Sequence, residues 1–398
     1  MRQNRHTGDE APGQGIGRGT NQGGMREANE RLLLTVLRRN APMAKADIAR
    51  ATGLSAQTVA RLIGALEDEG LIARGTPKKG RIGQPSTPLS LDPLGALFLG
   101  MKVGRRSVEM VVIDFVGRVL DREQHLYDYP DFAVVRDFAN AAAAQLRARL
   151  PDGLQDRVGG LGIAMPFHLW NWAQHIGVDA ALMADWERRD LQAEVAGALD
   201  IPVFLQNDAT SACSAEMVFG AAPMPANALC FFLAFFIGGG LVINNTLYSG
   251  STGNAAGLGP LQVPDRDGQV RPLIDLASLS VLEKSLVEQG HDARQMWVDP
   301  EAWTFPAPIV EAWLGQCAVA MARAICSVQT LLDLEAILID GWMPRDVVAD
   351  LTARVRGELA GLDLTGLERP EIKAGTIGKD ARAIGAASLP LGHRFLMV

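Results

Sequence analysis

The sequence predicts an α/β protein in which a small helical head precedes a two-lobed body. The chain has 398 residues, which is enough for two or three domains at roughly 100–200 residues each. Residues 1–92 carry 14 Lys and Arg against 9 Asp and Glu, a net charge of +5, whereas the remainder carries 24 against 36, a net charge of −12. From Leu97 onward, strand patterns alternate with helical patterns across glycine junctions, which is typical of an α/β body.

The division of charge decides which partners the chain can have. The whole-chain charge of −7 alone would argue against a nucleic-acid partner. A basic front part joined to an acidic remainder is instead typical of a DNA-binding head on a separate effector domain. We therefore predict a head at residues 25–92, with a basic wing and linker, and a body at residues 93–398. Residues 1–24 hold seven glycines and mixed charge, so we expect a disordered tail there.

Composition also indicates a cytoplasmic protein. The longest run of apolar residues and glycine, from Ala228 to Ile243, is 16 residues long and falls short of the ~20 needed to span a bilayer, so we expect buried strand there and no membrane partner. The N-terminus has no apolar signal core. The four cysteines stand far apart, which fits a reducing compartment without disulfides or a zinc cluster.

The head has the pattern of a helix-turn-helix. Helical spacing predicts a first helix over Glu27–Arg39 and a second over Lys45–Thr52, which Gly53 ends. Ser55 is a typical N-cap for a third helix, which stops at Gly70. The apolar residues of that third helix recur at i, i+3, i+4 and i+7: Val59, Leu62, Ile63 and Leu66.

A helix-turn-helix presents the first turn of its third helix to a DNA major groove. Gln57 can pair bidentately with adenine, and Arg61 with guanine or phosphate. The predicted DNA-contacting residues of the helices are Lys45, Ser55, Ala56, Gln57, Thr58 and Arg61.

The segment after the third helix predicts a wing. Leu71–Arg74 and Pro88–Leu91 have the pattern of two short strands around a glycine-rich loop. Lys78, Lys79 and Arg81 in that loop could enter a narrow minor groove. The alternative is a solvated linker after an ordinary three-helix bundle. The turn chemistry, the helix order and the charge division favour DNA binding.

The body begins as an antiparallel meander with a turn at residues 104–106. A long Ala-rich helix follows, and then strands and helices alternate. The predicted strands are Leu97–Val103, Ser107–Phe115, Gly117–Leu120, Val158–Ala164, Val203–Asp208, Leu229–Phe236 and Leu241–Ile243, and the predicted helices are Phe132–Leu150 and Ala209–Phe219.

Head and body together resemble the ROK family of repressors, open reading frames and kinases, from about Glu27 to the C-terminus. The resemblance implies a two-lobed, actin-like sugar-kinase ATPase fold and assembly as a dimer or larger oligomer. The residues that carry it are Gly83-Gln84-Pro85, Gly160 to Pro166, Pro202 to Glu216, Gly238 to Asn244 and Leu247 to Gly250.

The segments that bind nucleotide in kinases of this family are altered. Where the family has Asp-x-Gly-Gly-Thr-Lys, this chain has Lys102, Gly104 and then Arg105-Arg106-Ser107. The second phosphate motif becomes Ala234-Phe235-Phe236, with Phe232 nearby. A phosphate cradle needs backbone donors, a hydroxyl and a metal-placing acid, so we expect no bound ATP and no catalytic residue. Arg105 and Arg106 could instead grip phosphate, or be solvated or salt-bridged.

The zinc motif of the family is also absent. Asp265 to Ser278 replaces it without Cys or His, and the preceding family histidine aligns with Pro260. A tetrahedral zinc site cannot be assembled from these residues, so we expect no zinc.

The sugar-binding residues of the family are partly retained. Asn207 and Asp208 survive, and Asp208 stands where the kinases keep their catalytic base. In one interpretation the pair binds ligand hydroxyls; in the other it caps the helix that begins near Ala209. The predicted effector-binding residues are Asn207, Asp208, His168, Asn254 and Asp275; the family's glutamates align with Gly257 and with Ile274, beside Asp275.

An aromatic loop lies where family members have a short sugar-facing loop. It holds His168, Trp170, Trp172 and His175, which could face a ligand or belong to the core or a dimer interface.

These observations give one main hypothesis and two alternatives. We expect a sequence-specific, DNA-binding repressor of carbohydrate-related genes that binds a palindrome as a homodimer or higher homo-oligomer. Its kinase-like body would be catalytically inactive and sense a sugar-like effector. The alternatives are an ATP-dependent sugar kinase and a regulator that needs no ligand.

Overall fold

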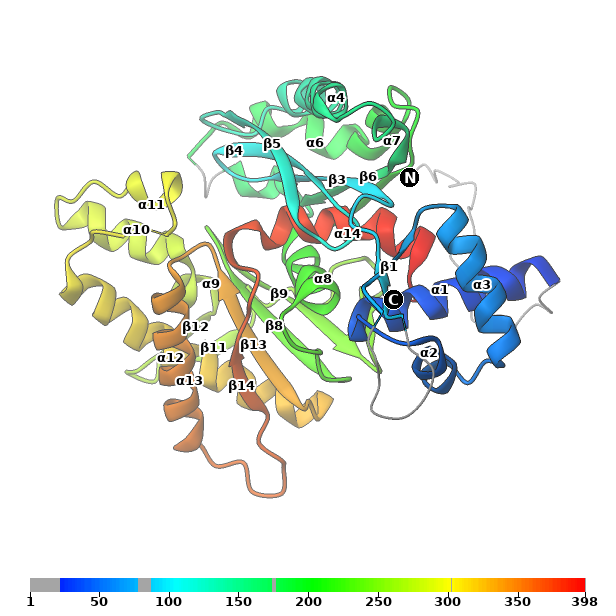
Figure 1. Cartoon of the computed structure of the whole chain (residues 1–398). Coiled ribbons are helices and arrows are strands. Elements are labelled where there is room, and N and C mark those ends of the chain that lie inside the picture. The colour runs from blue at the N-terminus through cyan, green and yellow to red at the C-terminus, as the bar shows by residue number, and fades with distance from the viewer. Residues whose placement is uncertain (1–21, 78–86, 174–176, 302, 398) are drawn as a thin grey trace, which may run out of the picture.

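A computed structural model describes residues 22–77, 87–173, 177–301 and 303–397, and it places a helical head against one side of a two-lobed body (Figure 1). Helix α1 spans Gln22–Asn40 and so starts earlier than predicted. Gly23 and Gly24 made the first turn look non-helical because glycine has a low helix propensity. The rest of the predicted tail lies outside the described residues.

The head follows the predicted order. Helix α2 spans Lys45–Thr52 and α3 spans Ala56–Asp68, separated by Gly53, whose φ of +70° is a conformation that glycine adopts without strain. Strands β1 (Ile72–Arg74) and β2 (Leu89–Leu91) pair antiparallel. The apolar faces of these elements form one buried core: Leu33, Leu34, Leu37, Ile48, Val59, Leu62, Ile63, Leu66, Ile72, Leu89 and Leu91.

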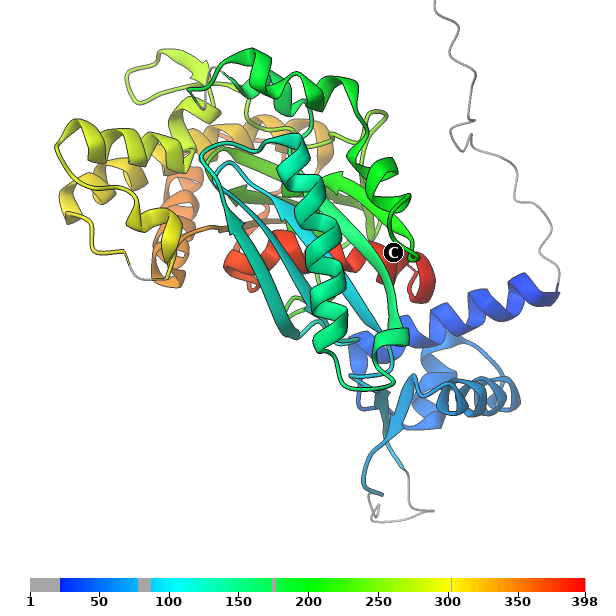
Figure 2. The same ribbon diagram turned by 90° about the horizontal axis from the view of Figure 1, so that it is seen from above.

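The first lobe is a mixed sheet in the order β5-β4-β3-β6-β7, with antiparallel pairing on the β5 side and parallel pairing on the β7 side. Helix α4 (Phe132–Arg149) covers the outer face of this sheet (Figure 2). Strand β5 extends beyond the predicted strand. Its many polar side chains are typical of an edge strand with one exposed face, and they made the second half look like a loop in the sequence. The strands are β3 (Leu97–Val103), β4 (Ser107–Ile113), β5 (Val119–Leu126), β6 (Val158–Met165) and β7 (Val203–Asn207).

Short helices complete the first lobe, the first of them just before β6 and the others between β6 and β7. They are 3₁₀ turns at Gln155–Arg157, Leu169–Trp172 and Ala180–Met183, and helices α6 (Asp185–Arg188) and α7 (Leu191–Ala196).

The second lobe repeats the plan in the order β10-β9-β8-β13-β14. The apolar run from Ala228 to Ile243 forms two paired strands, and the turn lies at residues 234–236, where we had predicted strand. The strands are β8 (Ala228–Leu233), β9 (Ile237–Ile243), β10 (Thr246–Tyr248), β13 (Ala336–Gly341), β14 (Glu371–Ala374) and the separate hairpin β11 (Gln262–Pro264) and β12 (Val270–Pro272).

Helices pack against this second sheet. They are α9 (Ile274–Ala277), α10 (Leu279–Glu288), α11 (Gln295–Val298), α12 (Ala307–Leu332) and α13 (Arg345–Ala360). Among the described residues, α12 is long and apolar enough to cross a membrane, but 67% of its apolar window is buried in the protein. It contributes Trp313, Leu314, Met321 and Ile325 to the core of the second lobe, as expected of a core helix.

Two helices lie between the lobes and pack on each other. Helix α8 (Asp208–Phe219) follows β7, and α14 (Ala381–Phe395) runs between the two sheets (Figure 1). A Cβ added to Gly385 of α14 would lie 1.7 Å from the Ser211 carbonyl of α8, so only glycine allows this approach. The Ser214 and Ser388 hydroxyls, 2.7 Å apart, join the same two helices.

Candidate functional site

The first turn of α3 is free to contact a ligand outside the protein. The Ser55 hydroxyl accepts a hydrogen bond from the Thr58 backbone N–H at 3.1 Å, which confirms the predicted N-cap. Ala56, Gln57 and Arg61 are exposed, while Val59 of the same turn is buried. Lys45, at the start of α2, is also exposed.

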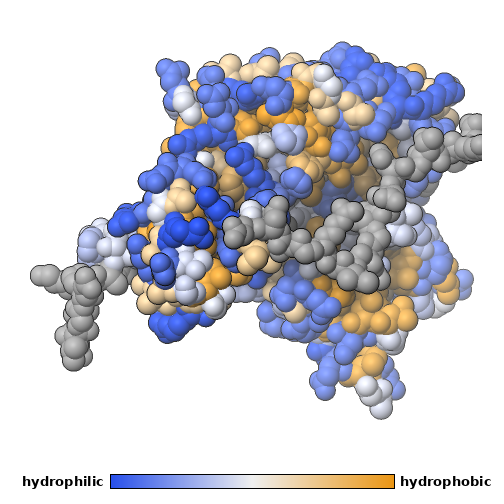
Figure 3. Space-filling view, turned by 90° about the vertical axis from the view of Figure 1, so that its right-hand side faces the viewer, coloured by the Kyte–Doolittle hydropathy of each residue, from blue (hydrophilic) through white to orange (hydrophobic). Residues whose placement is uncertain are grey.

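The acidic end of α3 is occupied within the head. Glu67 accepts hydrogen bonds from Arg74 of β1, at 2.7 Å from Nη2, and this partner lowers the pKa of the Glu67 carboxyl. The two wing strands are paired as predicted. The basic residues between them, Lys78, Lys79 and Arg81, lie outside the described residues. On the face of the molecule that carries the head, hydrophilic residues are interspersed with hydrophobic ones (Figure 3).

The head is fastened to the body through α1. Arg38 donates to the Val218 carbonyl at the C-terminal end of α8, from Nε at 3.0 Å and Nη2 at 2.7 Å, and to the Phe115 carbonyl at 3.2 Å. Its guanidinium also lies over the Phe219 ring, 4.2 Å from the centroid. Desolvation in this contact lowers the pKa of Arg38 to about 10.

A second arginine of α1 holds the end of α14. Arg31 donates from Nε to the Leu396 carbonyl at 2.9 Å and from Nη2 to the Gly392 carbonyl at 3.1 Å. The Thr35 hydroxyl accepts from the Met397 N–H at 2.9 Å. The C-terminal ends of both inter-lobe helices are therefore hydrogen-bonded to the first helix of the head.

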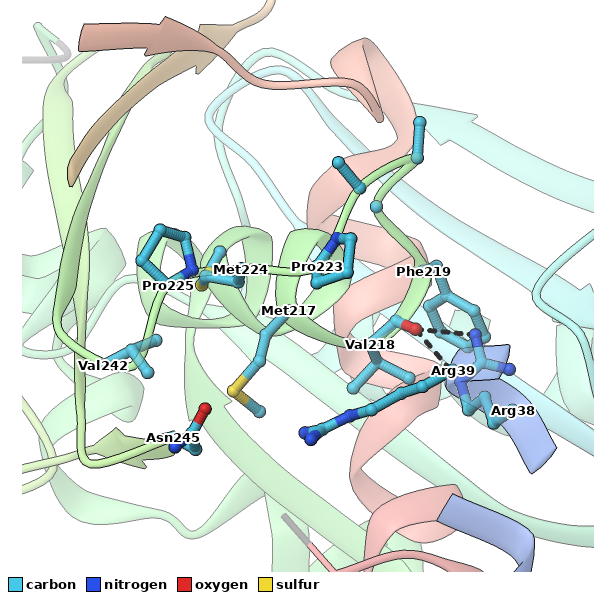
Figure 4. Close-up of a pocket in the computed structure, with 13 residues that line it drawn as sticks. Arg38, Arg39, Met217, Val218, Phe219, Pro223, Met224, Pro225, Val242 and Asn245 are labelled. Carbon is cyan, nitrogen blue, oxygen red and sulfur yellow. Dashed lines mark hydrogen bonds between the residues drawn. The ribbon is translucent and has the colours of Figure 1, made fainter. Parts of the chain in front are cut away.

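A cavity of about 340 Å³ lies at this junction (Figure 4). Arg38 and Arg39 line it from the head, and Met217 and Asn245 are among the residues that line it from the body. The Arg39 side chain extends from the end of α1 toward Met217. The junction thus combines a cavity with the hydrogen bonds between Arg38 and Val218 that line it.

A second cavity, of about 290 Å³, lies between the lobes and is called here the cleft. It has the size of a small-ligand site. Four of the five predicted effector residues line it: Asn207, Asp208, His168 and Asn254. The fifth, Asp275, is exposed on α9 and does not line the cleft, although its neighbour Ile274 does. The short helix directs residue 274, not residue 275, to the cleft, so the structure does not bring Asp275 together with the other four residues.

The interpretation that the Asn207–Asp208 pair caps α8 holds for Asn207 but not for Asp208. The Asn207 Oδ1 accepts from the N–H groups of Ala209 and Thr210, and its Nδ2 donates to Asn254 Oδ1 at 3.3 Å. Asp208 instead forms an ion pair at 3.4 Å with Arg382, at the N-terminal end of α14. Arg382 lies 174 residues away along the chain, and sequence analysis missed it.

The residues of the aromatic loop that the structure describes either line the cleft or pack against other aromatic side chains. His168 has a φ of 56° and lines the cleft, where its ring contacts Trp170 edge to face. Trp172 packs edge to face on Phe236 of the other lobe, 4.7 Å between centroids, and so bridges the cleft. His175 lies outside the described residues.

The altered phosphate segment lines a smaller cavity of about 50 Å³ that shares Gly104, Arg105, Phe235 and Arg382 with the cleft. Lys102 is buried here: its Nζ lies 3.0 Å from Glu109 and 4.1 Å from the centroid of Trp342 on the other lobe. Desolvation and the charge of Arg382 lower the pKa of Lys102 to about 8. The acid of the family motif is thus replaced by a lysine, which forms an ion pair with a carboxylate of the protein itself.

Arg105 also reaches the other lobe. Its guanidinium lies 4.0 Å from the centroid of Phe235, and Nη1 lies 3.3 Å from Glu283. The sequence left open whether Arg105 grips phosphate or is solvated or salt-bridged, and the structure shows a salt bridge to Glu283. Neighbouring Arg106 is exposed.

The segment that replaces the family's zinc motif contains the turn of the β11–β12 hairpin and strand β12. Asp265 closes its turn by accepting from the N–H groups of Asp267 and Gln269. Within the described residues, no cluster of three or more His, Cys, Asp and Glu could hold a metal. The residues present do not fit a zinc ion, and the expectation that none binds stays a prediction.

A winged helix-turn-helix joined to two lobes of repeated sheet topology defines a DNA-binding head on a sugar-kinase fold. Residues 98–392 match the ROK family, and residues 26–73 match a winged helix-turn-helix DNA-binding family. The chain belongs to the ROK family. The predicted fold class and family are confirmed.

The comparisons include relatives of different kinds. The uncharacterized protein y4fQ of Sinorhizobium fredii is 26% identical over 372 residues, which cover 92% of this chain and 91% of that protein. The xylose repressor of Bacillus spizizenii is 25% identical over 239 residues, 60% of this chain and 61% of the repressor. The chain thus spans less than two thirds of that repressor's length.

Two solved structures share the fold. A ROK family transcriptional regulator, a homolog of the E. coli MLC protein, has a TM-score of 0.60 at 20% identity, covering 92% of this chain and 96% of that one. A ROK family glucokinase from Streptomyces griseus has a TM-score of 0.57 at 21% identity, covering 74% of this chain and 99% of that one. The regulator matches more of this chain than the glucokinase does.

Proposed function

We propose that the protein is a cytoplasmic, sequence-specific transcriptional repressor of carbohydrate-related genes whose body binds a sugar-like effector. The observation that carries the proposal is the exposed first turn of α3 on a winged head that is hydrogen-bonded to the helices lining the cleft. The likeness to xylose repressors and to a ROK transcriptional regulator supports it. A homodimer would present two α3 helices to a palindrome, as two-fold symmetric operators require.

The same two helices would carry the effector signal. Asp208 and Arg382 lie in the cleft at the N-terminal ends of α8 and α14. The opposite ends of these helices accept hydrogen bonds from Arg38 and Arg31 of the head. A ligand that shifts the Asp208–Arg382 pair would therefore move the two points at which the head is held, and favour one of two head orientations.

DNA binding is tested with the purified full chain and the DNA upstream of its own gene, by fluorescence polarisation at several salt concentrations. We expect a site that binds at least a hundredfold more tightly than scrambled DNA, with affinity that falls as salt rises. Equal affinity for the scrambled sequence, or binding that does not depend on salt, contradicts the proposal.

We also propose that the body transfers no phosphoryl group. Lys102, in place of the acid of the family's motif, is paired with Glu109, Arg105 replaces a glycine of that motif, and Asp208 is paired with Arg382. These residues do not fit a bound nucleotide.

The competing hypothesis is an ATP-dependent sugar kinase with Asp208 as its base. It predicts sugar-dependent release of ADP that disappears in Asp208→Asn. We expect no release above background from either protein, and no heat of ATP binding by calorimetry. Turnover by the wild type that the substitution abolishes would support the kinase.

A further inference from the structure

Two arginines in the cleft have binding capacity that the protein does not use. Arg105 and Arg382 line both the cleft and its smaller extension. Each gives one hydrogen bond, from Nη1 to a carboxylate, at 3.3 Å to Glu283 and at 3.4 Å to Asp208. In both, Nε is buried and has no hydrogen-bond partner among the residues that the structure describes.

The unused part of each guanidinium is the edge that binds oxyanions best. Nε and Nη2 form a planar fork that donates two parallel hydrogen bonds to a carboxylate or phosphate. No described residue accepts from Nε or Nη2 of either arginine. A buried donor without an acceptor costs free energy, so two of them in one cavity indicate a missing acceptor.

The charges around the cleft also favour an anion. Lys102, Arg105, Arg106 and Arg382 line the smaller cavity, and no carboxylate lines it. Of the carboxylates near these cations, Glu109, Glu283 and Asp208 each pair with one of them, and Asp380, which acts on Lys102, pairs with Arg122. Arg106 is exposed and has no carboxylate partner in the described part of the chain, so this end of the cleft carries a positive excess.

The other end of the cleft is suited to hydroxyl groups. Asn207 and Asn254 supply amide donors and acceptors, and Trp172 and Phe236 supply aromatic walls. A cavity of about 290 Å³ has room for a molecule of monosaccharide size beside an anionic group in the extension of about 50 Å³.

We infer that the effector is an anionic polyol, a sugar acid or a sugar phosphate, whose oxyanion binds Arg105 and Arg382 while its hydroxyls face Asn207 and Asn254. This inference rests on the proposed role of the cleft as the effector site. A neutral sugar offers these two buried Nε donors only hydroxyl and ring oxygens, which accept more weakly than a charged oxyanion that meets the Nε and Nη2 fork. An oxyanion satisfies both and would draw Arg382 away from Asp208, the pair that joins α8 to α14.

The oxyanion is tested first, with inorganic phosphate as the probe. Thermal unfolding of the full-length protein is measured in phosphate and in chloride at equal ionic strength. We expect phosphate to raise the melting temperature, and the increase to disappear in Arg105→Gln and in Arg382→Gln. The control is Arg294→Gln, an exposed arginine of the second lobe paired only with Asp292, which keeps the full increase.

The source of the oxyanion is tested next by calorimetry with glucose, gluconate and glucose 6-phosphate. We expect at least one anion to bind tenfold or more tightly than glucose, and this advantage to fall at least tenfold in Arg105→Gln. Tighter binding of gluconate identifies a carboxylate ligand, and tighter binding of the phosphate ester identifies a phosphoryl ligand. Glucose binding as tightly as both anions overturns the inference, and so does the absence of any phosphate effect in the folded wild type.

Arg382→Gln can weaken folding because it breaks the pair with Asp208. Arg382→Lys keeps the charge but lacks the planar fork, so it should fold and still lose most of the anion preference. If Arg382→Lys and Arg105→Lys both retain that preference, the bidentate contact is overturned. The result is separate from that of the proposed function: lack of operator binding refutes the repressor while leaving the calorimetry of the cleft unaffected.

Discussion

Arg38 of the head donates two hydrogen bonds to the carbonyl of Val218, the residue before the last of α8, although 180 residues separate them in sequence. The first residue of the same helix, Asp208, lies in the cleft. One helix of 12 residues therefore joins the candidate ligand site to the candidate DNA-binding domain. Coupling between the cleft and the head would not need a flexible linker, because α8 is a rigid helix with a polar contact at each end.

Arg38→Met should weaken both stability and coupling. It leaves the Val218 and Phe115 carbonyls without their donor, which costs about 1–3 kcal/mol of unfolding free energy. Operator affinity should then respond less to a ligand of the cleft. Urea unfolding and fluorescence polarisation with and without ligand measure the two effects.

Arg39→Met is the matched control for Arg38→Met. Arg39 is the next residue of α1, is exposed and makes no hydrogen bond to a described residue. We expect a change within about 0.5 kcal/mol for this surface substitution. Equal losses in the two variants would show that the Val218 contact has no particular role.

Gln57→Ala and Arg61→Ala should weaken operator binding without affecting folding. Both side chains are exposed on α3, and a lost bidentate base contact costs about 1–3 kcal/mol of discrimination, roughly 5- to 150-fold in affinity. Fluorescence polarisation measures the loss. A substitution that reads a base lowers specific binding more than non-specific binding; equal loss on scrambled DNA would reassign that residue to phosphate.

Local sequence patterns predicted the head well because its elements are specified within a few residues. Ser55 caps α3 through the N–H three residues away, and the i, i+3, i+4 pattern places Val59, Leu62 and Ile63 in the core. The cap of α8 was ambiguous because Asn207 and Asp208 can both cap. Tertiary packing decided it, since Arg382 draws Asp208 away.

The contacts that define the cleft could not be predicted in this way. Arg105 with Glu283 and Asp208 with Arg382 join residues more than 170 positions apart. The resemblance to the ROK family located the altered segment at residues 102–107, but it did not show that Lys102 pairs with Glu109. The predicted meander pairs these two strands, but the register that places Lys102 opposite Glu109 is given by the structure alone.

Lys102 should make stability depend on pH. Its pKa is lowered to about 8 in the folded state, chiefly by desolvation, from 10.5 when solvated. Between these values the unfolded chain binds more protons than the folded chain, so stability rises with pH across this window. The side chain is 4% exposed, and the full shift corresponds to at most about 3 kcal/mol.

The effect of Lys102 is isolated by comparison with Lys102→Met. Urea unfolding of both proteins is measured at two pH values, about 7.5 and 9.5, within the range where the two protonation states exchange. We expect the wild type to gain about 1–2 kcal/mol over the variant as pH rises. A difference between the two proteins that stays constant with pH would mean that the buried amine keeps its ordinary pKa.

Gly385→Ala should separate α8 from α14. The added Cβ would lie 1.7 Å from the Ser211 carbonyl oxygen, and backbone cannot yield there as a flexible side chain could. The helices must move apart, which opens the Ser214–Ser388 contact and the core around it. We expect a loss above about 3 kcal/mol, the range of severe core overpacking.

Gly357→Ala is the matched control, since this glycine lies within α13 and a Cβ there meets no atom within 4 Å. It should gain about 0.5–1 kcal/mol from helix propensity alone. Thermal unfolding of the two variants therefore gives shifts of opposite sign, and a shift of the same sign in both would mean that the close approach of α8 and α14 is not required for stability.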